Sequence, residues 1–178
     1  MNRTNFEQIA AHYIERFEEI NNEEHAEYYK WQVCQRFRPL MDLALSAPAE
    51  EFSKALDDVR KCTENMIDSY TQPFYGLVDM TRKRGDSYPV DAIETVRRMF
   101  LDLYAVDGGD LWVRMKKIEK FFETSNELLT EYAPGSFLYK QDSHSVSAYL
   151  FLYDPEHHYM YKAMQSKAMA DCIEFGDD

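Results

Sequence analysis

The chain has 178 residues, of which 45% are hydrophobic and 29% charged, and its formal net charge is −12. A chain of this length buries roughly two-thirds of its unfolded surface without needing a disulfide or a metal, and its composition excludes a disordered or low-complexity protein. The negative charge repels a nucleic-acid backbone at long range, so tight DNA binding would need a local basic patch.

The first predicted helix begins near Thr4, a capping residue type, and carries an apolar stripe from Phe6 to Ile20 at spacings of three and four. Its opposite face holds Glu15, Glu18 and then further glutamates. Because no ExxH or HxxxH pair accompanies these carboxylates, we interpret them as a solvated acidic face rather than as a metal site.

The second predicted helix runs from Glu27 to about Arg38, where Pro39 limits or kinks it. It places Trp31 and Phe37 on one side of the cylinder. Aromatic side chains beside cations are typical of an amphipathic core helix with a charged rim, and also of a surface that stacks bases and contacts phosphates. The sequence favours the core helix.

Two more helices and a loop are predicted in the middle of the chain. The apolar spacing predicts a helix over Pro48–Tyr70, with the proline in its first turn. After a break at residues 71–73, a shorter helix is predicted over Phe74–Arg84. The sequence RKRGDSYP at 82–89 then predicts a loop, because glycine, proline and small polar residues cluster there.

Two longer helices follow. Asp91 and Glu94 have capping-box spacing and open a helix that ends at Tyr104. Residues 107–110 predict a turn between helices rather than a phosphate loop, because the chain contains no GxxxxGK[ST] motif. The next helix, 111–132, is the longest, and its predicted inward residues are Leu111, Met115, Ile118, Phe122, Ser125, Leu129 and Tyr132.

The last third of the chain is predicted to hold a loop at 137–143, a helix that closes near Tyr153, and a final helix from Gln165 to Ile173 that buries Met169 and Cys172. The Asp154-Pro155 pair ends the first of these helices, because proline disfavours helical geometry in the residue before it. One short extended segment is predicted near 158–162. We therefore predict a mainly α protein, with a single domain of seven or eight helices over residues 1–178.

Cysteine spacing and apolar runs bear on the compartment. The three cysteines, Cys34, Cys62 and Cys172, are odd in number, far apart and never in CxxC spacing, which indicates buried free thiols in a reducing compartment. No segment resembles a signal peptide or approaches the roughly 20 apolar residues of a membrane span. We expect a cytoplasmic protein without membrane contact.

Positive charge is concentrated in one part of the sequence. Residues 82–120 carry nine basic and seven acidic side chains, and every other part of the chain is acidic. These nine residues are the candidates for a basic patch, with solvated helix faces of mixed charge as the alternative. They are Arg82, Lys83, Arg84, Arg97, Arg98, Arg114, Lys116, Lys117 and Lys120.

Residues for catalysis are few. His144 lies between two serines, but adjacent residues do not face one another as a catalytic triad requires. His157 and His158 are adjacent, and adjacent ligands rarely complete one coordination sphere. We therefore predict no metal, no cofactor and no enzymatic activity for this chain. The aromatic segment 146–162 that contains these two histidines serves either as a core seam or as a recognition surface, and the sequence favours the seam.

Four blocks of sequence carry a family resemblance. They are YYKWQVCQRF (28–37), ETVRRMFLDLY (94–104), YAPGSFLYKQDSHSVSAYLFLYDPEHHYMYK (132–162) and SKAMADCI (166–173). In this order they resemble the N-terminal helical region that precedes the AAA+ motor in some bacterial McrB-like ATPases of modification-dependent restriction systems.

The resemblance implies a non-catalytic target-recognition or regulatory domain, an N-terminal module of a longer ATPase. The motor would then lie outside this sequence, and DNA and a partner nuclease would be its partners. The matching positions imply a binding surface made of Lys30, Trp31, Tyr149, Tyr159, Tyr161 and Lys162. Two other functions remain open: an acidic protein-interaction or assembly module that forms a homo-oligomer, and a small-molecule or nucleotide pocket at the aromatic segment.

Overall fold

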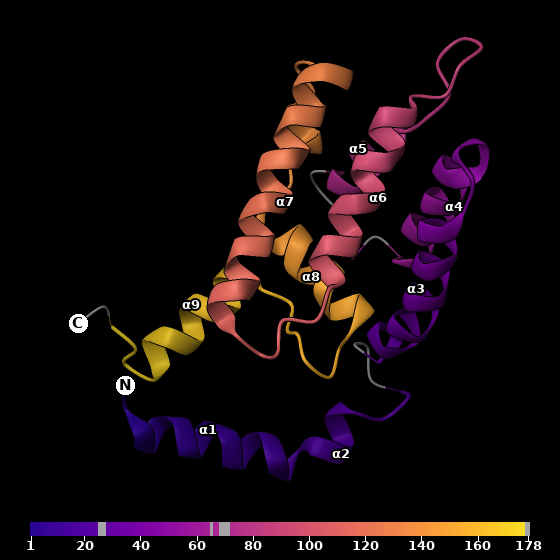
Figure 1. Ribbon diagram of the computed structural model, residues 1–178. Coiled ribbons are helices and arrows are strands. Elements are labelled where there is room, and N and C mark those ends of the chain that lie inside the picture. The colour runs from indigo at the N-terminus through magenta and orange to yellow at the C-terminus, as the bar shows by residue number, and fades with distance from the viewer. Residues whose placement is uncertain (25–27, 65, 68–71, 177–178) are drawn as a thin grey trace. The chain divides into compact units, whose positions relative to one another are not determined.

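The structure is a computed structural model that describes residues 1–24, 28–64, 66–67 and 72–176 (Figure 1). These residues form no β-strand, which confirms the prediction of a mainly α protein. Residues 158–162, predicted to include an extended segment, are irregular. The helices are α1 (Arg3–Glu15), α2 (Phe17–Ile20), α3 (Tyr29–Ser46), α4 (Ala49–Cys62), α5 (Pro73–Met80), α6 (Val90–Tyr104), α7 (Leu111–Tyr132), the 3-10 helix η1 (Phe137–Tyr139), α8 (Ser143–Tyr153) and α9 (Ala163–Cys172).

The chain divides into two compact units. The first contains Met1–Gln32 and Tyr161–Asp178, and the second contains Val33–Met160. The boundary falls inside α3, and no linker composition marks it in the sequence. The predicted helix start at residue 27, and the predicted end and break at residues 70 and 71, lie outside the described residues.

The first unit joins the two ends of the chain (Figure 1). The backbone N–H of Asn2 donates to the carbonyl of Ile173 at 2.5 Å, and the side-chain amide of Asn5 donates to the carbonyl of Cys172 at 2.8 Å. Asn2 also caps α1 by accepting from the Asn5 N–H, so the predicted cap at Thr4 is wrong. The prediction that α9 buries Cys172 is wrong too, because this thiol is exposed and only the adjacent Ile173 is buried.

Helix α3 passes through Pro39, contrary to the predicted end there. Proline removes one intrahelical hydrogen bond and costs about 3 kcal/mol in a helix interior. Beyond the proline, α3 buries Met41, Ala44 and Leu45, and each large apolar side chain contributes roughly 1.5–3 kcal/mol on burial. Burial of these side chains beyond the proline therefore outweighs the lost intrahelical hydrogen bond.

Several other predicted boundaries are revised. Helix α4 ends at Cys62 and α5 at Met80, so both helices are shorter than predicted. The predicted loop at 82–89 is confirmed as a tight turn in which Gly85 has φ +61. Asp91 and Glu94 form no capping box, because α6 begins at Val90 and its N-cap residue is Pro89, which provides no side-chain cap. A capping box is formed instead by Asp142 and Ser145 at the start of α8.

Helix α7 has the predicted bounds but a different inward face. Ser125 and Leu129 are buried as predicted, together with Phe121 and Leu128, whereas Leu111 and Met115 are exposed, contrary to prediction. The face that packs along α6 is centred on Phe121. The predicted stripe is therefore wrong at Leu111 and Met115 and is confirmed at Ser125 and Leu129.

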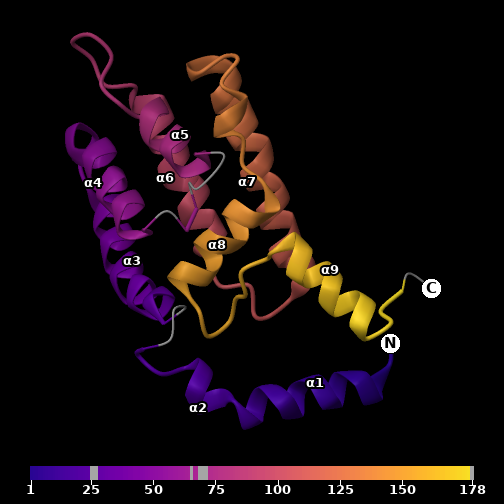
Figure 2. The same cartoon turned by 180° about the vertical axis from the view of Figure 1, so that it is seen from behind.

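The core of the second unit is an aromatic cluster around Tyr149 of α8. Its ring centroid lies 5.3 Å from Phe74 of α5, 5.6 Å from Phe100 of α6 and 6.0 Å from Phe121 of α7. The view from behind shows α8 beside these helices (Figure 2). The Tyr149 hydroxyl donates to the Gln141 side chain at 2.8 Å, so its polar end is satisfied.

Gly76 lets α5 approach η1 closely. A Cβ atom at this position would lie 2.5 Å from the Cβ and 2.6 Å from the Cγ of Tyr139. We expect Gly76→Ala to destabilise the second unit by about 1–2 kcal/mol, because the clash outweighs the gain of roughly 1 kcal/mol in helix propensity. Urea denaturation measures this change, and a variant more stable than the original chain would contradict the close packing.

Candidate functional site

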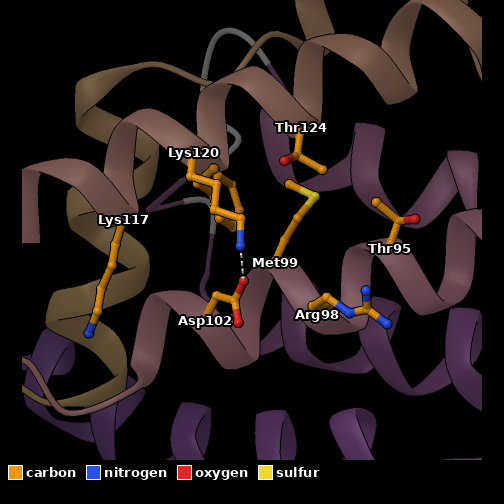
Figure 3. A pocket seen from close by; sticks show the side chains of 8 residues that line it. Thr95, Arg98, Met99, Asp102, Lys117, Lys120 and Thr124 are labelled. Carbon is orange, nitrogen blue, oxygen red and sulfur yellow. Dashed lines mark hydrogen bonds and ion pairs between the residues drawn. The ribbon is translucent and has the colours of Figure 1, made fainter.

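A groove runs between α6 and α7 in the second unit (Figure 3). Its volume is about 240 Å³. Helix α6 contributes Thr95, Arg98, Met99 and Asp102, and helix α7 contributes Lys117, Lys120, Phe121 and Thr124. Three members of the predicted basic patch therefore meet here, together with five residues that the sequence did not indicate as a site.

The helical repeat explains this set. Thr95 and Met99 are four residues apart on α6, as are Arg98 and Asp102, so each pair lies on one side of the helix. Met99 and the facing Phe121 are turned toward the core and are 5% and 2% exposed. They form an apolar floor. The charged and hydroxyl side chains stand along the edges of the same two helices (Figure 3).

The charged groups of the groove are held to different degrees. Lys120 forms an ion pair with Asp102 at 2.5 Å, and the ammonium of Lys117 donates to the carbonyl of Ala105. Among the described residues, Arg98 has no hydrogen-bond or ion-pair partner, and its side chain is exposed. Three cations and one carboxylate give the groove a net charge of +2, in a chain whose formal charge is −12.

Arg97 is not part of this surface. Its guanidinium donates to the carbonyls of Leu45 and Ala47 and lies 4.7 Å from the ring centroid of Phe52. The prediction that Arg97 belongs to an exposed basic patch is therefore wrong: this side chain ties α6 to the turn after α3.

The other predicted basic residues lie apart from the groove and have local partners. Arg82 donates to the Tyr75 hydroxyl, and Arg84 donates to the carbonyl of Tyr132. Lys83 lies over the ring of Tyr88. Two more are paired with carboxylates, Lys116 with Glu119 and Arg114 with Asp107.

Tyr149, predicted as a surface contact, is 0% exposed and belongs to the aromatic core. That prediction is wrong, because the ring packs against helices α5, α6 and α7. Tyr159, from the same stretch, is 87% exposed and is available for contact. The aromatic stretch therefore supplies both a core seam and an exposed side chain.

In the first unit, the structure brings Lys30 and Lys162 together, as the resemblance implies for one surface. Burial and then the positive charge of Lys162 lower the pKa of Lys30 to about 8. Trp31 and Tyr161, which are adjacent to them in sequence, are exposed. Tyr159 belongs to the second unit.

A second pocket, of about 450 Å³, lies beside the end of the aromatic helix in segment 146–162. It is lined in part by Tyr104, Arg114, Asp154, His157 and His158. Tyr104 stacks on Tyr153 with ring centroids 3.8 Å apart.

The pocket's charged groups largely satisfy one another. Arg114 lowers the pKa of Asp107 to about 2 through a hydrogen bond of 2.9 Å. Asp154 accepts from His157 at 3.0 Å.

The two histidines of this pocket titrate in opposite directions. A hydrogen bond from His157 to Asp154, followed by the charge of that carboxylate, raises the pKa of His157 above 6.5. Burial, followed by the charge of Arg114, lowers the pKa of His158 below 6.5. At any given pH, His157 is therefore protonated to a greater extent than His158.

The described residues also bear on metal sites, reactive thiols and membrane spans. These residues contain no group of three His, Cys, Asp or Glu side chains placed to hold a metal ion. The three cysteines are free, and burial raises the pKa of Cys34 and of Cys62 to about 11. Within the same part of the chain, no helix combines the length and the apolar character needed to cross a membrane.

Comparison with known proteins gave no relative. No protein-family model matches the chain, and neither a curated protein nor a solved structure was found to be similar to it.

The Asp154–His157 pair generates a pH prediction. The raised pKa of His157 stabilises the folded state fully below the ordinary pKa of 6.5, and this stabilisation is lost as pH rises through the higher folded pKa. Burial alone would raise the pKa of Asp154, but the hydrogen bond and charge of His157 hold it below 3.8. The stabilisation that Asp154 provides is therefore lost as pH falls through that lower pKa.

We expect Asp154→Asn to lower the pKa of His157 toward 6.5 in an NMR titration.

Glu156→Gln provides the matched control for this titration. It removes a carboxylate that raises the pKa of His157 through charge alone, so it should cause the smaller fall. An equal fall in the two variants would show that the hydrogen bond to Asp154 contributes nothing.

Proposed function

We propose that the chain is a non-catalytic recognition module that contacts DNA through the groove between α6 and α7. The observation that carries the proposal is the local charge of +2 in an acidic chain, with Arg98 free of any partner among the described residues. The resemblance to the N-terminal regions of McrB-like ATPases supports the same role. In that role, a AAA+ motor and a partner nuclease would act on the target that this module binds.

Phosphate binding matches the chemistry of the groove. Arginine and lysine supply most of the phosphate contacts in protein–DNA complexes, together with threonine hydroxyls. Such contacts position the protein but do not read sequence. Arg98 is exposed, and its planar guanidinium offers two parallel donors to one phosphate. The groove therefore supports binding to the backbone rather than base readout.

The non-catalytic part of the proposal rests on the state of the nucleophiles. A thiol with a pKa of about 11 is almost entirely protonated at neutral pH, and this holds for Cys34 and Cys62. His157 is bound to a carboxylate at the surface rather than to a nucleophile. These groups are better suited to structural roles than to covalent catalysis.

An assembly module is the second candidate, and a different observation favours it. The first turns of α7 expose Leu111, Trp112 and Met115 on neighbouring positions of one face, and Trp112 is 64% exposed. Exposed aromatic and apolar side chains of this kind are typical of protein interfaces. Sedimentation velocity tests this candidate: strictly monomeric behaviour at high concentration would count against a homo-oligomer.

A small-molecule site at the aromatic segment 146–162 is the third candidate. The pocket there holds His158, whose pKa burial lowers below 6.5, beside Arg114. A thermal-shift screen with nucleotides tests it, and the absence of any shift would contradict it.

The DNA proposal predicts the effect of reversing one charge. We expect Arg98→Glu to weaken binding to duplex and single-stranded DNA uniformly across sequences, and to reduce the slope of log K against log salt by about 1. Fluorescence anisotropy between about 50 and about 200 mM salt measures this slope. Because Arg98 is exposed and unpaired among the described residues, the thermal unfolding midpoint should not change.

Lys83→Glu is the matched control. It makes the same change in net charge but lies in the turn before α6, outside the groove. It should leave most of the DNA affinity intact. Equal loss in the two variants would show that only net charge matters, and the absence of salt-dependent binding by the unmodified chain would refute the proposal.

A further inference from the structure

We infer that the groove between α6 and α7 binds a phosphate monoester that carries a ring, either free in solution or at the 5′ end of a nucleic-acid strand. This inference rests on the proposed function and names the ligand chemistry of the same site. It follows from the size, the charge and the floor of the groove.

Size excludes a duplex from the groove. The groove volume of about 240 Å³ is smaller than that of a typical drug-sized site. A duplex could therefore touch only the rim, while a single phosphorylated group could enter.

Charge favours a monoester over a diester. A phosphodiester in a nucleic-acid backbone carries one negative charge, whereas a phosphate monoester carries about −1.5 to −2 at pH 7. The net charge of the groove is +2, from Arg98, Lys117 and Lys120 against Asp102. A terminal or free phosphate therefore brings up to twice the negative charge of an internal phosphate to this positively charged groove.

The three cations are not gathered at one point: Figure 3 shows the Lys120–Asp102 ion pair between Arg98 on one side and Lys117, which points away from it, on the other. Lys117 and Lys120 are already held by the Ala105 carbonyl and by Asp102, so little side-chain freedom remains to be lost on binding. Arg98 has no partner to give up among the described residues. The ion pair of Lys120 leaves an oxygen of Asp102 as an acceptor for a hydroxyl or amino group on the same ligand.

The floor of the groove indicates the rest of the ligand. Met99 and Phe121 supply a polarisable and an aromatic surface beneath the charged edge. Thr95 and Thr124 place one hydroxyl on each helix above this floor (Figure 3). A sugar or base attached to the phosphate would lie against this floor, whereas inorganic phosphate would leave it uncovered.

Two forms of one oligonucleotide test the inference. A short oligothymidylate labelled at its 3′ end is prepared with a 5′-phosphate and with a 5′-hydroxyl, and its binding to the full chain is measured by anisotropy. We expect the 5′-phosphate to tighten binding roughly tenfold or more, as one or two added charge-assisted hydrogen bonds would. Arg98→Glu should abolish this gain, and Lys83→Glu should keep it.

Calorimetry with free ligands separates the two sources. If thymidine 5′-monophosphate binds more tightly than both thymidine and inorganic phosphate, the ligand is a free nucleotide. If 5′-phosphorylated strands bind and the free nucleotide fails to bind, the ligand is a strand terminus. Thr124→Val retains the shape of the side chain and should weaken binding of the monophosphate without changing stability, because its hydroxyl has no other partner among the described residues.

The possible failures are distinguishable. Equal affinity for the 5′-phosphate and 5′-hydroxyl strands, with sensitivity to Arg98→Glu, would overturn the inference and leave the DNA proposal intact. Binding of the monophosphate alone would support the inference and overturn the DNA proposal. No binding of any of these probes would overturn both.

Discussion

The second unit depends on the burial of one tyrosine. Tyr149 touches the rings of Phe74, Phe100 and Phe121, which come from three different helices. Its hydroxyl donates to Gln141, whose amide donates in turn to the carbonyl of Pro73 at the start of α5. A buried phenol without a partner would cost roughly 1–3 kcal/mol. The apolar cluster and the polar bridge therefore require the same arrangement of α5 and α8.

This cluster also sets the geometry of the groove. Phe100 and Phe121 join α6 to α7 at the core, with ring centroids 5.4 Å apart. This contact therefore fixes the positions of the two residues that precede these phenylalanines, Met99 on α6 and Lys120 on α7. The groove is formed by rigid helices rather than by loops, which favours a preorganised binding site over one that must close around its ligand.

The sequence predicted the helical class and the bounds of residues 111–132, because apolar spacing survives in long helices. It failed at the predicted helix end near Arg38, because burial beyond Pro39 outweighs the lost hydrogen bond. It favoured a core seam for the aromatic segment 146–162, as the burial of Tyr149 confirms, whereas the family resemblance wrongly placed Tyr149 on a binding surface. It identified the cations of the groove as a basic stretch, but not their grouping. Thr95 and Thr124 line the same groove only because of the way in which α6 and α7 pack, and no local sequence pattern encodes this packing.

Phosphate binding in the groove between α6 and α7 is the central proposal. Its most direct test is an NMR titration of the chain labelled with ¹³C at the methionine methyl groups, with the 5′-phosphorylated oligothymidylate as ligand. We predict that the Met99 methyl signal shifts progressively, because this residue forms the floor of the groove, while the buried Met41 and Met80 stay unchanged. Binding of the ligand without any shift of Met99 would contradict the account.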